Sequence, residues 1–216
     1  MTDPTPLPVF ITQRLVHAGP DAAGHDGLDR RWHDRAQRWG VRLVPLPNDP
    51  DAAEFALCHG TSSAGIILSG GGDLSGVPGG QTPDAVREQV ERTGLDWARS
   101  LGRAVLGVCR GAQLLWRDAG GTLTAVTGHT SGTHALVPTA DGTDAGVGPG
   151  VVNSFHAYRC TGEPEGLVTL AGAGDGTVEA FSSRAAREVG ILWHPERPGN
   201  TVSLDLLLKR LFARKT

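Results

Sequence analysis

Short apolar runs alternate with helical patterns along the first half of the chain. Each run has four or five residues and little polar content, which predicts strands that are buried on both faces. The predicted strands cover residues 9–12, 41–44, 64–68 and 104–108. Pro45 and Pro47 are expected to end the second of these strands.

Two amphipathic helices are expected between these strands. The first is predicted over residues 29–40 and is closed by Gly40. The second begins at Thr82 and Pro83, a cap residue followed by the proline that helices favour at their first position. The apolar positions at three-to-four spacing are Leu28, Trp32, Ala36 and Trp39 in the first helix and Val86, Val90, Trp97 and Leu101 in the second.

The second half of the chain is richer in Gly and Thr and has shorter apolar segments. A terminal helix is predicted over residues 200–215, and a loose loop over 141–150. Early alternation of strands and helices, then mostly strands, predicts an α/β fold with a central, mostly parallel sheet and an appended hairpin layer. With no repeat or linker visible, residues 1–216 are expected to form a single domain. The later strands are predicted over residues 122–126, 134–137, 151–156, 167–171, 177–181 and 189–193, and the apolar stripe of the terminal helix is Leu204, Leu207, Leu208 and Leu211.

Composition narrows the function classes. The chain has 216 residues, a formal net charge of -3 and 39% hydrophobic residues, as globular domains do. No run could span a membrane, and no basic patch predicts nucleic-acid binding. The first residues lack an export signal, which favours the cytoplasm. The three cysteines, Cys58, Cys109 and Cys160, have no C-x-x-C spacing, so neither a disulfide framework nor a zinc knuckle is expected.

The strand that ends at Val108 leads into the sequence Gly107-Val-Cys109-Arg110-Gly111 and then into an apolar helical segment. This strand–turn–helix pattern is typical of a nucleophile elbow with Cys in place of Ser. Glycines on both sides let strand and helix approach closely, and a helix N-terminus stabilises the reactive thiolate. A buried cysteine that only packs at a strand end fits the same residues.

A thiol nucleophile needs a base and a group that orients the base. His194 follows a short apolar strand, and Glu196 lies two residues further on, where an extended backbone points side chains to the same side. Pro195 stiffens this span. The order Cys, His, Glu disfavours an α/β-hydrolase, whose acid precedes its histidine. Considered separately, His194 could be a histidine that only packs at a strand end, and Glu196 could be a solvated carboxylate.

The glycine-rich turn at residues 70–73 follows a predicted strand and can supply unhindered backbone N–H groups to an oxyanion. The N–H of Arg110, directly after the nucleophile, is the natural second donor. A phosphate-binding loop is disfavoured, because no Gly-Lys-Ser/Thr follows and no G-x-G-x-x-G opens a helix. The same residues could also form an ordinary turn without a catalytic role.

These motifs together resemble the class I glutamine amidotransferase-like superfamily. The elbow at 107–115, the His194-Pro-Glu196 pair and the turn at 70–73 resemble the superfamily's nucleophile, His-x-Glu and oxyanion segments, and the motifs spread over residues 9–197. Within it, the chain is most similar to the γ-glutamyl-γ-aminobutyrate hydrolase-like branch. The segments 11–14 and 68–74 further suggest the γ-glutamyl-CDP-amidate hydrolase subgroup.

The resemblance implies a flavodoxin-like sandwich and a Cys-His-Glu triad that cleaves a γ-glutamyl amide through a thioester. Cys109 would attack the γ-carbonyl, His194 would transfer the proton, and Glu196 would orient His194. The N–H groups of Gly72 and Arg110 would form the oxyanion hole. The substrate would be a small γ-glutamyl compound, and no cofactor is implied.

The resemblance also implies substrate contacts, and most have a structural alternative. Gln113 matches a residue that contacts the glutamyl group, although a helix-cap role fits too. Arg14 could meet a phosphate on the leaving group or form a salt bridge on the rim. Metal binding is not expected, because the spacing of His129, His134 and His156 fits no common zinc pattern. The residues expected to touch substrate are Gly71, Gln113, Asn153, Ser154, Phe155, His156, Gln13 and Arg14.

Three function classes follow. The first is a free-standing γ-glutamyl amide hydrolase, and the second is a glutaminase subunit that delivers ammonia to a partner synthetase. The third, a non-catalytic binding protein, is disfavoured by the intact set Cys109, His194 and Glu196. No synthetase domain follows the terminal helix, which favours the first class, and the sequence is compatible with a homodimer.

Overall fold

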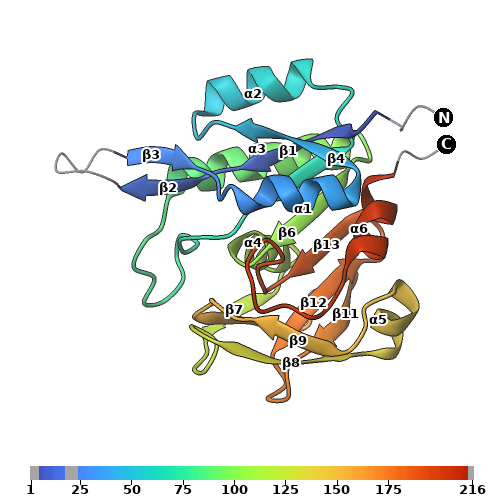
Figure 1. Cartoon of the computed structure of the whole chain (residues 1–216). Helices are drawn as coiled ribbons and strands as arrows, with labels where there is room; N and C mark the ends of the chain where they lie inside the picture. The colour runs from blue at the N-terminus through green and yellow to red at the C-terminus, as the bar shows by residue number, and fades with distance from the viewer. Residues whose placement is uncertain (1–4, 18–23, 214–216) are drawn as a thin grey trace.

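A nine-stranded sheet runs through the computed structural model of the chain, which describes residues 5–17 and 24–213 (Figure 1). Five neighbouring strands are parallel, in the order β4 (Val41–Leu46), β1 (Leu7–Thr12), β5 (Gly65–Leu68), β6 (Ala104–Val108) and β13 (Glu188–Ile191). Antiparallel pairing then continues through β12 (Val178–Ser183), β11 (Leu167–Gly172), β8 (Thr133–Pro138) and β9 (Gly150–Asn153). The predicted α/β fold is confirmed, but most of the later strands extend the same sheet, and only β7 (Thr122–Ala125) and β10 (Tyr158–Thr161) form a separate ribbon.

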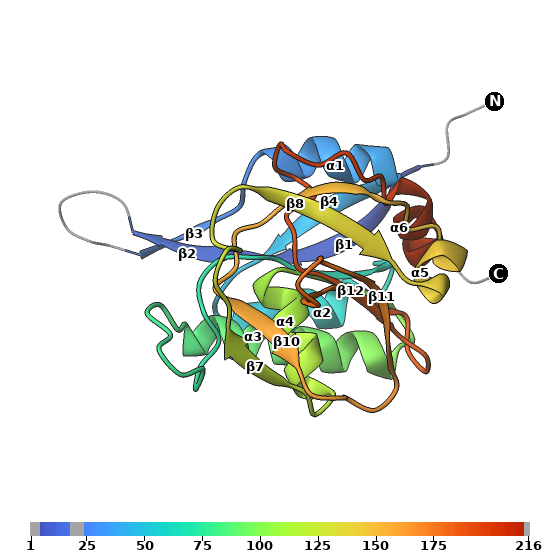
Figure 2. The same cartoon turned by 90° about the horizontal axis from the view of Figure 1, so that it is seen from below.

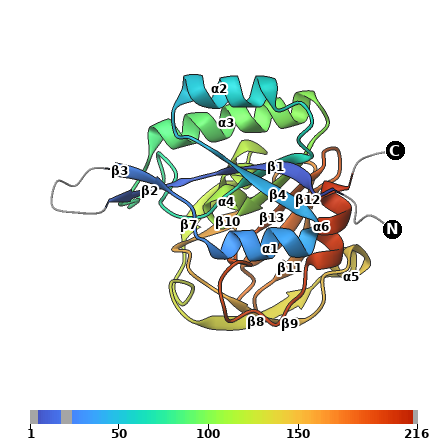
Figure 3. The same ribbon diagram turned by 45° about the horizontal axis from the view of Figure 1, so that its top comes forward.

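Helices cover both faces of the parallel half of the sheet. Figure 3 shows α1 (Arg31–Trp39) and α6 (Asp205–Phe212) on one side, and α2 (Pro50–His59) and α3 (Ala85–Ser100) on the other. The helix α4 (Arg110–Asp118) packs with α2 and α3 in the same apolar cluster. Because side chains alternate along a strand, β1, β4, β5 and β6 each supply both apolar clusters of the core, whereas β13 supplies only the cluster that includes Val189 and Ile191.

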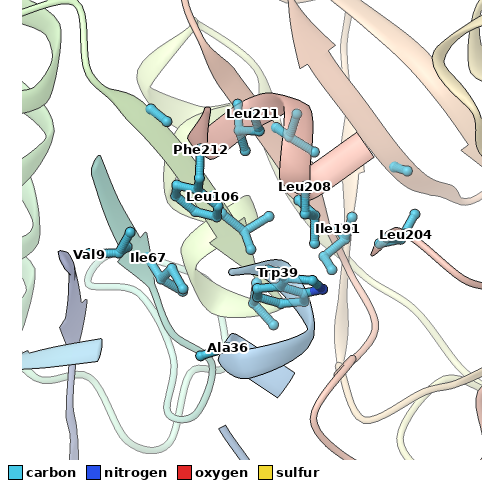
Figure 4. Close-up of a cluster of buried hydrophobic side chains, with 14 of the residues drawn as sticks. Val9, Ala36, Trp39, Ile67, Leu106, Ile191, Leu204, Leu208, Leu211 and Phe212 are labelled. Atoms are coloured by element: carbon cyan, nitrogen blue, oxygen red, sulfur yellow. The ribbon is translucent and has the colours of Figure 1, made fainter. Parts of the chain in front are cut away.

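The alternation is visible in the core residues. Val9 of β1 and Leu106 of β6 pack toward α1 and α6, whereas their neighbours Phe10 and Val105 pack toward α2, α3 and α4. Figure 4 shows Trp39 from α1 and Leu208 from α6 in the first cluster, near strand side chains such as Leu106. The two clusters hold the carboxyl ends of β5, β6 and β13 in a fixed relation.

Two small antiparallel ribbons are added to this frame. The hairpin of β2 (Arg14–His17) and β3 (Gly24–Gly27) projects from the body, as Figure 2 shows. The pair β7 (Thr122–Ala125) and β10 (Tyr158–Thr161) lies against α4 (Figure 2). Neither the first ribbon nor β10 is visible in the hydrophobic pattern, because these segments are short and largely polar.

Several predicted boundaries are wrong for local physical reasons. The strand β4 continues through Pro45 to Leu46, because it is the edge strand and a proline can lack its N–H donor on the unpaired side. The predicted loop at 141–150 contains the short helix α5 (Ala140–Ala145), capped by the Thr139 hydroxyl. The terminal helix begins at Asp205 rather than residue 200 and is described to Phe212, while the end of its predicted range lies outside the described residues.

The helix α2 was not predicted, although Asp49 accepts a hydrogen bond from the Ala52 N–H as its cap and Pro50 occupies its first turn. The helix α3 is capped by Asp84 and not by Thr82. Its expected apolar face is also partly wrong, because Val86 and Leu101 are exposed. Charged side chains of α3 are buried instead, and they support the glycine-rich turn. No helix among the described residues is long and apolar enough to cross a membrane.

We expect Leu208→Ala to lower the free energy of unfolding by about 2–5 kcal/mol, because Leu208 is fully buried in the first cluster and truncation leaves a cavity. The neighbouring Leu206 is 55% exposed. Its change to Ala is the matched control and should alter the free energy by no more than about 0.5 kcal/mol. Urea denaturation of both variants checks this, and equal losses would contradict the assigned helix face.

Candidate active site

Cys109 lies at the turn between β6 and α4 with a φ of 52°, the only non-glycine residue with a positive φ among the described residues. Such a strained backbone needs close packing around it. A Cβ added to Gly107 would come within 2.7 Å of backbone atoms of Gly111 and Ala112. A Cβ at Gly111 would clash with the Leu68 carbonyl oxygen. Both flanking glycines are therefore required for the elbow.

His194 follows β13 and is oriented by Glu196. Its Nδ1–H donates to Oε1 of Glu196 at 2.8 Å, and both side chains are buried. A Cβ at Gly70 would lie 3.2 Å from both Nε2 of His194 and Cβ of Cys109. The free ring nitrogen and the thiol-bearing residue therefore meet beside Gly70, and the three residues form a continuous chain Cys109–His194–Glu196.

The site favours a thiolate paired with an imidazolium. Burial raises the pKa of the Cys109 thiol, but hydrogen bonding to His194, the charges of His194 and His156 and the Arg110 N–H outweigh burial and lower it. Burial lowers the pKa of His194, but its contacts with Cys109 and Glu196 outweigh burial and raise it from 6.5 to about 9. The two shifts have opposite directions and favour the same pair, a Cys109 thiolate beside a His194 imidazolium.

Asn153 positions the segment that carries His194. Its Oδ1 accepts from the His194 backbone N–H at 2.9 Å, and its amide donates to the carbonyl oxygens of His194 and Pro198 at 2.8 and 3.0 Å. Ser154 is also buried and donates to the carbonyl of His129 at 2.8 Å. The side chains of Asn153 and Ser154 thus make hydrogen bonds within the protein, and a contact of these two residues with substrate stays a prediction.

A pocket of about 210 Å³ opens beside the thiol. Phe155, 41% exposed, stands at it with its ring edge-on to His194, and the Arg197 guanidinium lies 4.9 Å from the ring centre. Gln113 lines the pocket while its amide donates to the Tyr158 carbonyl at 2.9 Å. The pocket also brings together predicted site residues from distant segments, namely Gly71, Gly72, Cys109, His156 and His194.

A buried ion network supports the glycine-rich turn, and the hydrophobic pattern did not reveal it. Arg87 donates to the carbonyls of Ser69 and Gly71 at 2.6 and 2.7 Å and to Glu91 at 2.9 Å. Glu91 is fully buried and also pairs with the guanidinium of Arg110. The only signal for this network in the sequence is the i,i+4 spacing of Arg87 and Glu91, which is usual on exposed helix faces.

A second cavity, of about 480 Å³, adjoins the pocket and shares Gly71, Gly72 and Thr82 with it. Arg14 and Arg110 line this cavity, and Nη2 of Arg110 has no hydrogen-bond partner within the described residues. Gln13 lines neither cavity, since its side-chain amide donates to the Leu46 carbonyl at 3.0 Å. Of the two residues expected at the first strand end, the structure thus places Arg14 alone beside the pocket.

The structure also gathers three histidines that are scattered in the sequence. His129, His134 and His156 surround the buried carboxylate of Glu179, and His156 in addition lines the pocket beside Cys109. Their spacing of five and twenty-two residues fits no common zinc pattern, and nothing in the sequence joins them to Glu179.

We expect the inflection in the pH profile of Cys109 alkylation by iodoacetamide to lie below that of an ordinary thiol, because the contacts with His194 lower the pKa of Cys109. In His194→Asn the opposing effect of burial remains, so the inflection should move to higher pH and the rate at pH 7 should fall at least about tenfold. The assay uses a Cys58→Ser background, since Cys58 is exposed, while burial raises the pKa of Cys160. An unchanged profile in His194→Asn would contradict the ion pair.

Comparisons with known proteins agree with this geometry. The family model of Peptidase C26 matches residues 11–196. The putative glutamine amidotransferase-like protein YvdE of Lactococcus lactis is 30% identical, over 85% of this chain and 86% of its own length. The gamma-glutamyl-CDP-amidate hydrolase of Campylobacter jejuni is 29% identical, over 92% of this chain and 94% of its own length.

A solved structure has the same fold at lower identity. The glutamine amidotransferase of Thermotoga maritima superposes with a TM-score of 0.63 and 13% identity, covering 88% of this chain and 76% of that one. The family match spans most of the chain and includes the elbow and the His194-Pro-Glu196 segment. The chain belongs to the Peptidase C26 family, within the class I glutamine amidotransferase-like proteins.

Proposed function

We propose that the protein is a free-standing cysteine hydrolase that cleaves the γ-glutamyl amide bond of a small γ-glutamyl conjugate and releases glutamate. The observation that carries this proposal is the strained Cys109 at the N-terminus of α4, beside an imidazole that Glu196 holds at 2.8 Å. Hydrolysis through a nucleophile with a base and an orienting acid needs this arrangement.

The proposed reaction has two stages. The Cys109 thiolate adds to the γ-carbonyl carbon, and the N–H groups of Gly72 and Arg110 stabilise the oxyanion. The C–N bond then breaks as His194 gives its proton to the leaving amine, which leaves a γ-glutamyl thioester on Cys109. A water molecule, deprotonated by His194, attacks the thioester, and glutamate leaves as the thiolate is restored.

The glutamyl group is proposed to occupy the pocket beside Cys109. Gly71, Gln113, Phe155 and His156 line it and would contact the group. Asn153 and Ser154 would act indirectly, by fixing the His194 segment and the residues at the pocket mouth. A pocket of this size admits a glutamyl group but not the whole of a larger conjugate, so the leaving group must extend into the adjoining cavity.

An anionic leaving group suits that cavity. Arg14 and the unpartnered Nη2 of Arg110 supply positive charge there, and guanidinium groups bind phosphates well. The resemblance to the gamma-glutamyl-CDP-amidate hydrolase is consistent with a γ-glutamyl nucleotide amidate as substrate. The alternative, a glutaminase that hands ammonia to a partner synthetase, is in keeping with the amidotransferase-like name of the Lactococcus lactis relative.

The test is glutamate release by the purified chain alone from glutamine, γ-glutamyl-γ-aminobutyrate, other γ-glutamyl amines and a γ-glutamyl nucleotide amidate. We expect turnover of at least one of the larger conjugates, and loss of that turnover in Cys109→Ala with the fold intact by circular dichroism. Turnover that survives in Cys109→Ala would refute the assigned nucleophile. Slow cleavage of glutamine alone would favour the partner-dependent glutaminase.

Arg14→Ala should raise KM for a phosphate-bearing substrate by about tenfold to a hundredfold, because a charge-assisted hydrogen bond is lost. KM for neutral γ-glutamyl amines should change little. Arg42→Ala is the matched control, since Arg42 is exposed on β4 and lines neither cavity. Equal effects of Arg14→Ala on neutral and anionic substrates would argue against a phosphate contact.

A further inference from the structure

Four side chains from separate segments of the second half meet at one buried point. His129 precedes β8, His134 lies in β8, His156 follows β9, and Glu179 lies in β12. One nitrogen or oxygen atom from each lies within 4.8 Å of all the others. Glu179 is fully buried, and His129 and His156 are nearly so. This group, the Glu179 cluster, has no part in the proposed hydrolysis apart from the place of His156 at the pocket.

The distances from Glu179 to the three rings fit the edges of a metal coordination shell, and the ring nitrogens, which lie within 4.8 Å of one another, would have to draw closer together around an ion. Oε1 of Glu179 lies 3.3 Å from Nδ1 of His129, 3.3 Å from Nε2 of His134 and 3.4 Å from Nε2 of His156. A tetrahedral zinc ion with bonds of about 2.0–2.1 Å separates its ligand atoms by about 3.3–3.4 Å. Charge-assisted hydrogen bonds between nitrogen and carboxylate are shorter, at about 2.7–2.9 Å.

The atoms that face the centre of the cluster are also the ones left without hydrogen bonds. Within the described part of the chain, both carboxylate oxygens of Glu179 lack a hydrogen-bond partner, as does Nε2 of His134 and of His156. A buried polar atom without a partner keeps the full cost of its lost hydration, and a charged group costs more than a neutral one. A cation at the centre would satisfy the inward ring nitrogens and one carboxylate oxygen of Glu179 at once.

The outer nitrogens of the three rings are already engaged, as in known metal sites. Nδ1 of His156 lies 3.0 Å from the Tyr158 carbonyl, and Nδ1 of His134 lies 3.2 Å from the Ala135 carbonyl. Nε2 of His129 lies 3.1 Å from a carboxylate oxygen of Asp175. These oxygens accept a hydrogen bond from the outer ring N–H, which leaves the inward nitrogen with a free lone pair, the tautomer that binds a metal.

The Ser154 hydroxyl lies near Nδ1 of His129 but does not donate its proton to that nitrogen. Oγ of Ser154 is 3.3 Å from Nδ1 of His129, and its proton is donated to the His129 carbonyl at 2.8 Å. The lone pair on Nδ1 of His129 therefore stays available. The competing arrangement without a metal is an ion cluster in which protonated imidazoles balance the charge of Glu179.

We propose that His129, His134, His156 and Glu179 bind one zinc ion. Three imidazoles and a carboxylate form a set that suits zinc, and four protein ligands leave no open position for a reactant. The ion would therefore be structural. It would link the antiparallel pair of β8 and β9 to β12. It would also fix His156 and the residues just before it at the mouth of the pocket beside Cys109. The proposal is independent of the proposed hydrolase function.

The first test measures metal content and binding in the full chain. The protein is stripped with a chelator, checked by circular dichroism and titrated with Zn²⁺, and its bound metal is then measured by mass spectrometry. We expect one equivalent in the wild type and in Cys109→Ala, and a thermal midpoint that rises on zinc addition. Glu179→Gln and His134→Asn should raise the dissociation constant at least about a hundredfold, since changing a residue that only orients a ligand already costs up to that much.

Two controls separate this site from other zinc-binding groups. His59→Asn changes an exposed histidine on α2 and should leave the stoichiometry at one. Loss of the ion in Cys109→Ala would place it at the catalytic thiol and overturn the proposal. So would full binding in Glu179→Gln and His134→Asn, or no stoichiometric binding in the wild type, which would favour the protonated ion cluster.

A spectroscopic test serves if the cluster variants do not fold. Co²⁺ replaces zinc in the wild-type protein, and its visible absorption reports geometry and ligand type. We expect the strong d–d bands of a tetrahedral ion without a thiolate charge-transfer band. A six-coordinate spectrum, or a thiolate band that vanishes in Cys109→Ala, would refute the Glu179 cluster as the binding site.

Discussion

One buried carboxylate joins the two segments that shape the reaction centre. Glu91 of α3 lies between the guanidinium groups of Arg87 and Arg110, and none of the three side chains is more than 2% exposed. Removing one member of a buried ion network strands the charge of the others at a cost of about 3–5 kcal/mol. Arg87 fixes the carbonyls of the glycine-rich turn, and Arg110 is the first residue of α4. The turn and the elbow therefore hold their relative positions through Glu91.

The two halves of the sheet contribute differently to the site. The parallel strands end at one edge, where an open α/β sheet binds its ligands, and this edge carries Cys109 after β6 and His194 after β13. The antiparallel strands supply the residues that surround them, among them Asn153, which grips the His194 segment, and Phe155 at the pocket mouth. The candidate catalytic residues Cys109 and His194 thus follow parallel strands, and both halves of the chain supply the walls of the pocket.

The parts of the site that could be predicted are those whose residues form a short motif along the sequence. Cys109 stands between glycines at a strand–helix junction, and Glu196 is two residues from His194, so short-range geometry is enough. The network around Glu91 could not be predicted, because charged residues at helical spacing normally indicate an exposed face. The place of Glu179 among the three histidines could not be predicted either, because β12 is brought close to β8 and β9 only by the sheet order, with β11 between β12 and β8. Short or polar elements, such as the β2–β3 hairpin, lack the periodicity on which strand prediction depends.

Both edges of the nine-stranded sheet are closed to further strands. At β4, Pro45 withholds an N–H donor. At β9, the segment before α6 occupies the free side, where the Thr201 N–H donates to Val151 at 2.9 Å and the Asn153 N–H donates to Asn200 at 2.9 Å. Exposed strand edges invite pairing between copies, which leads to aggregation or to sheets that continue across a dimer. Pro45 at one edge and the segment before α6 at the other thus both disfavour an association in which copies of the chain continue this sheet.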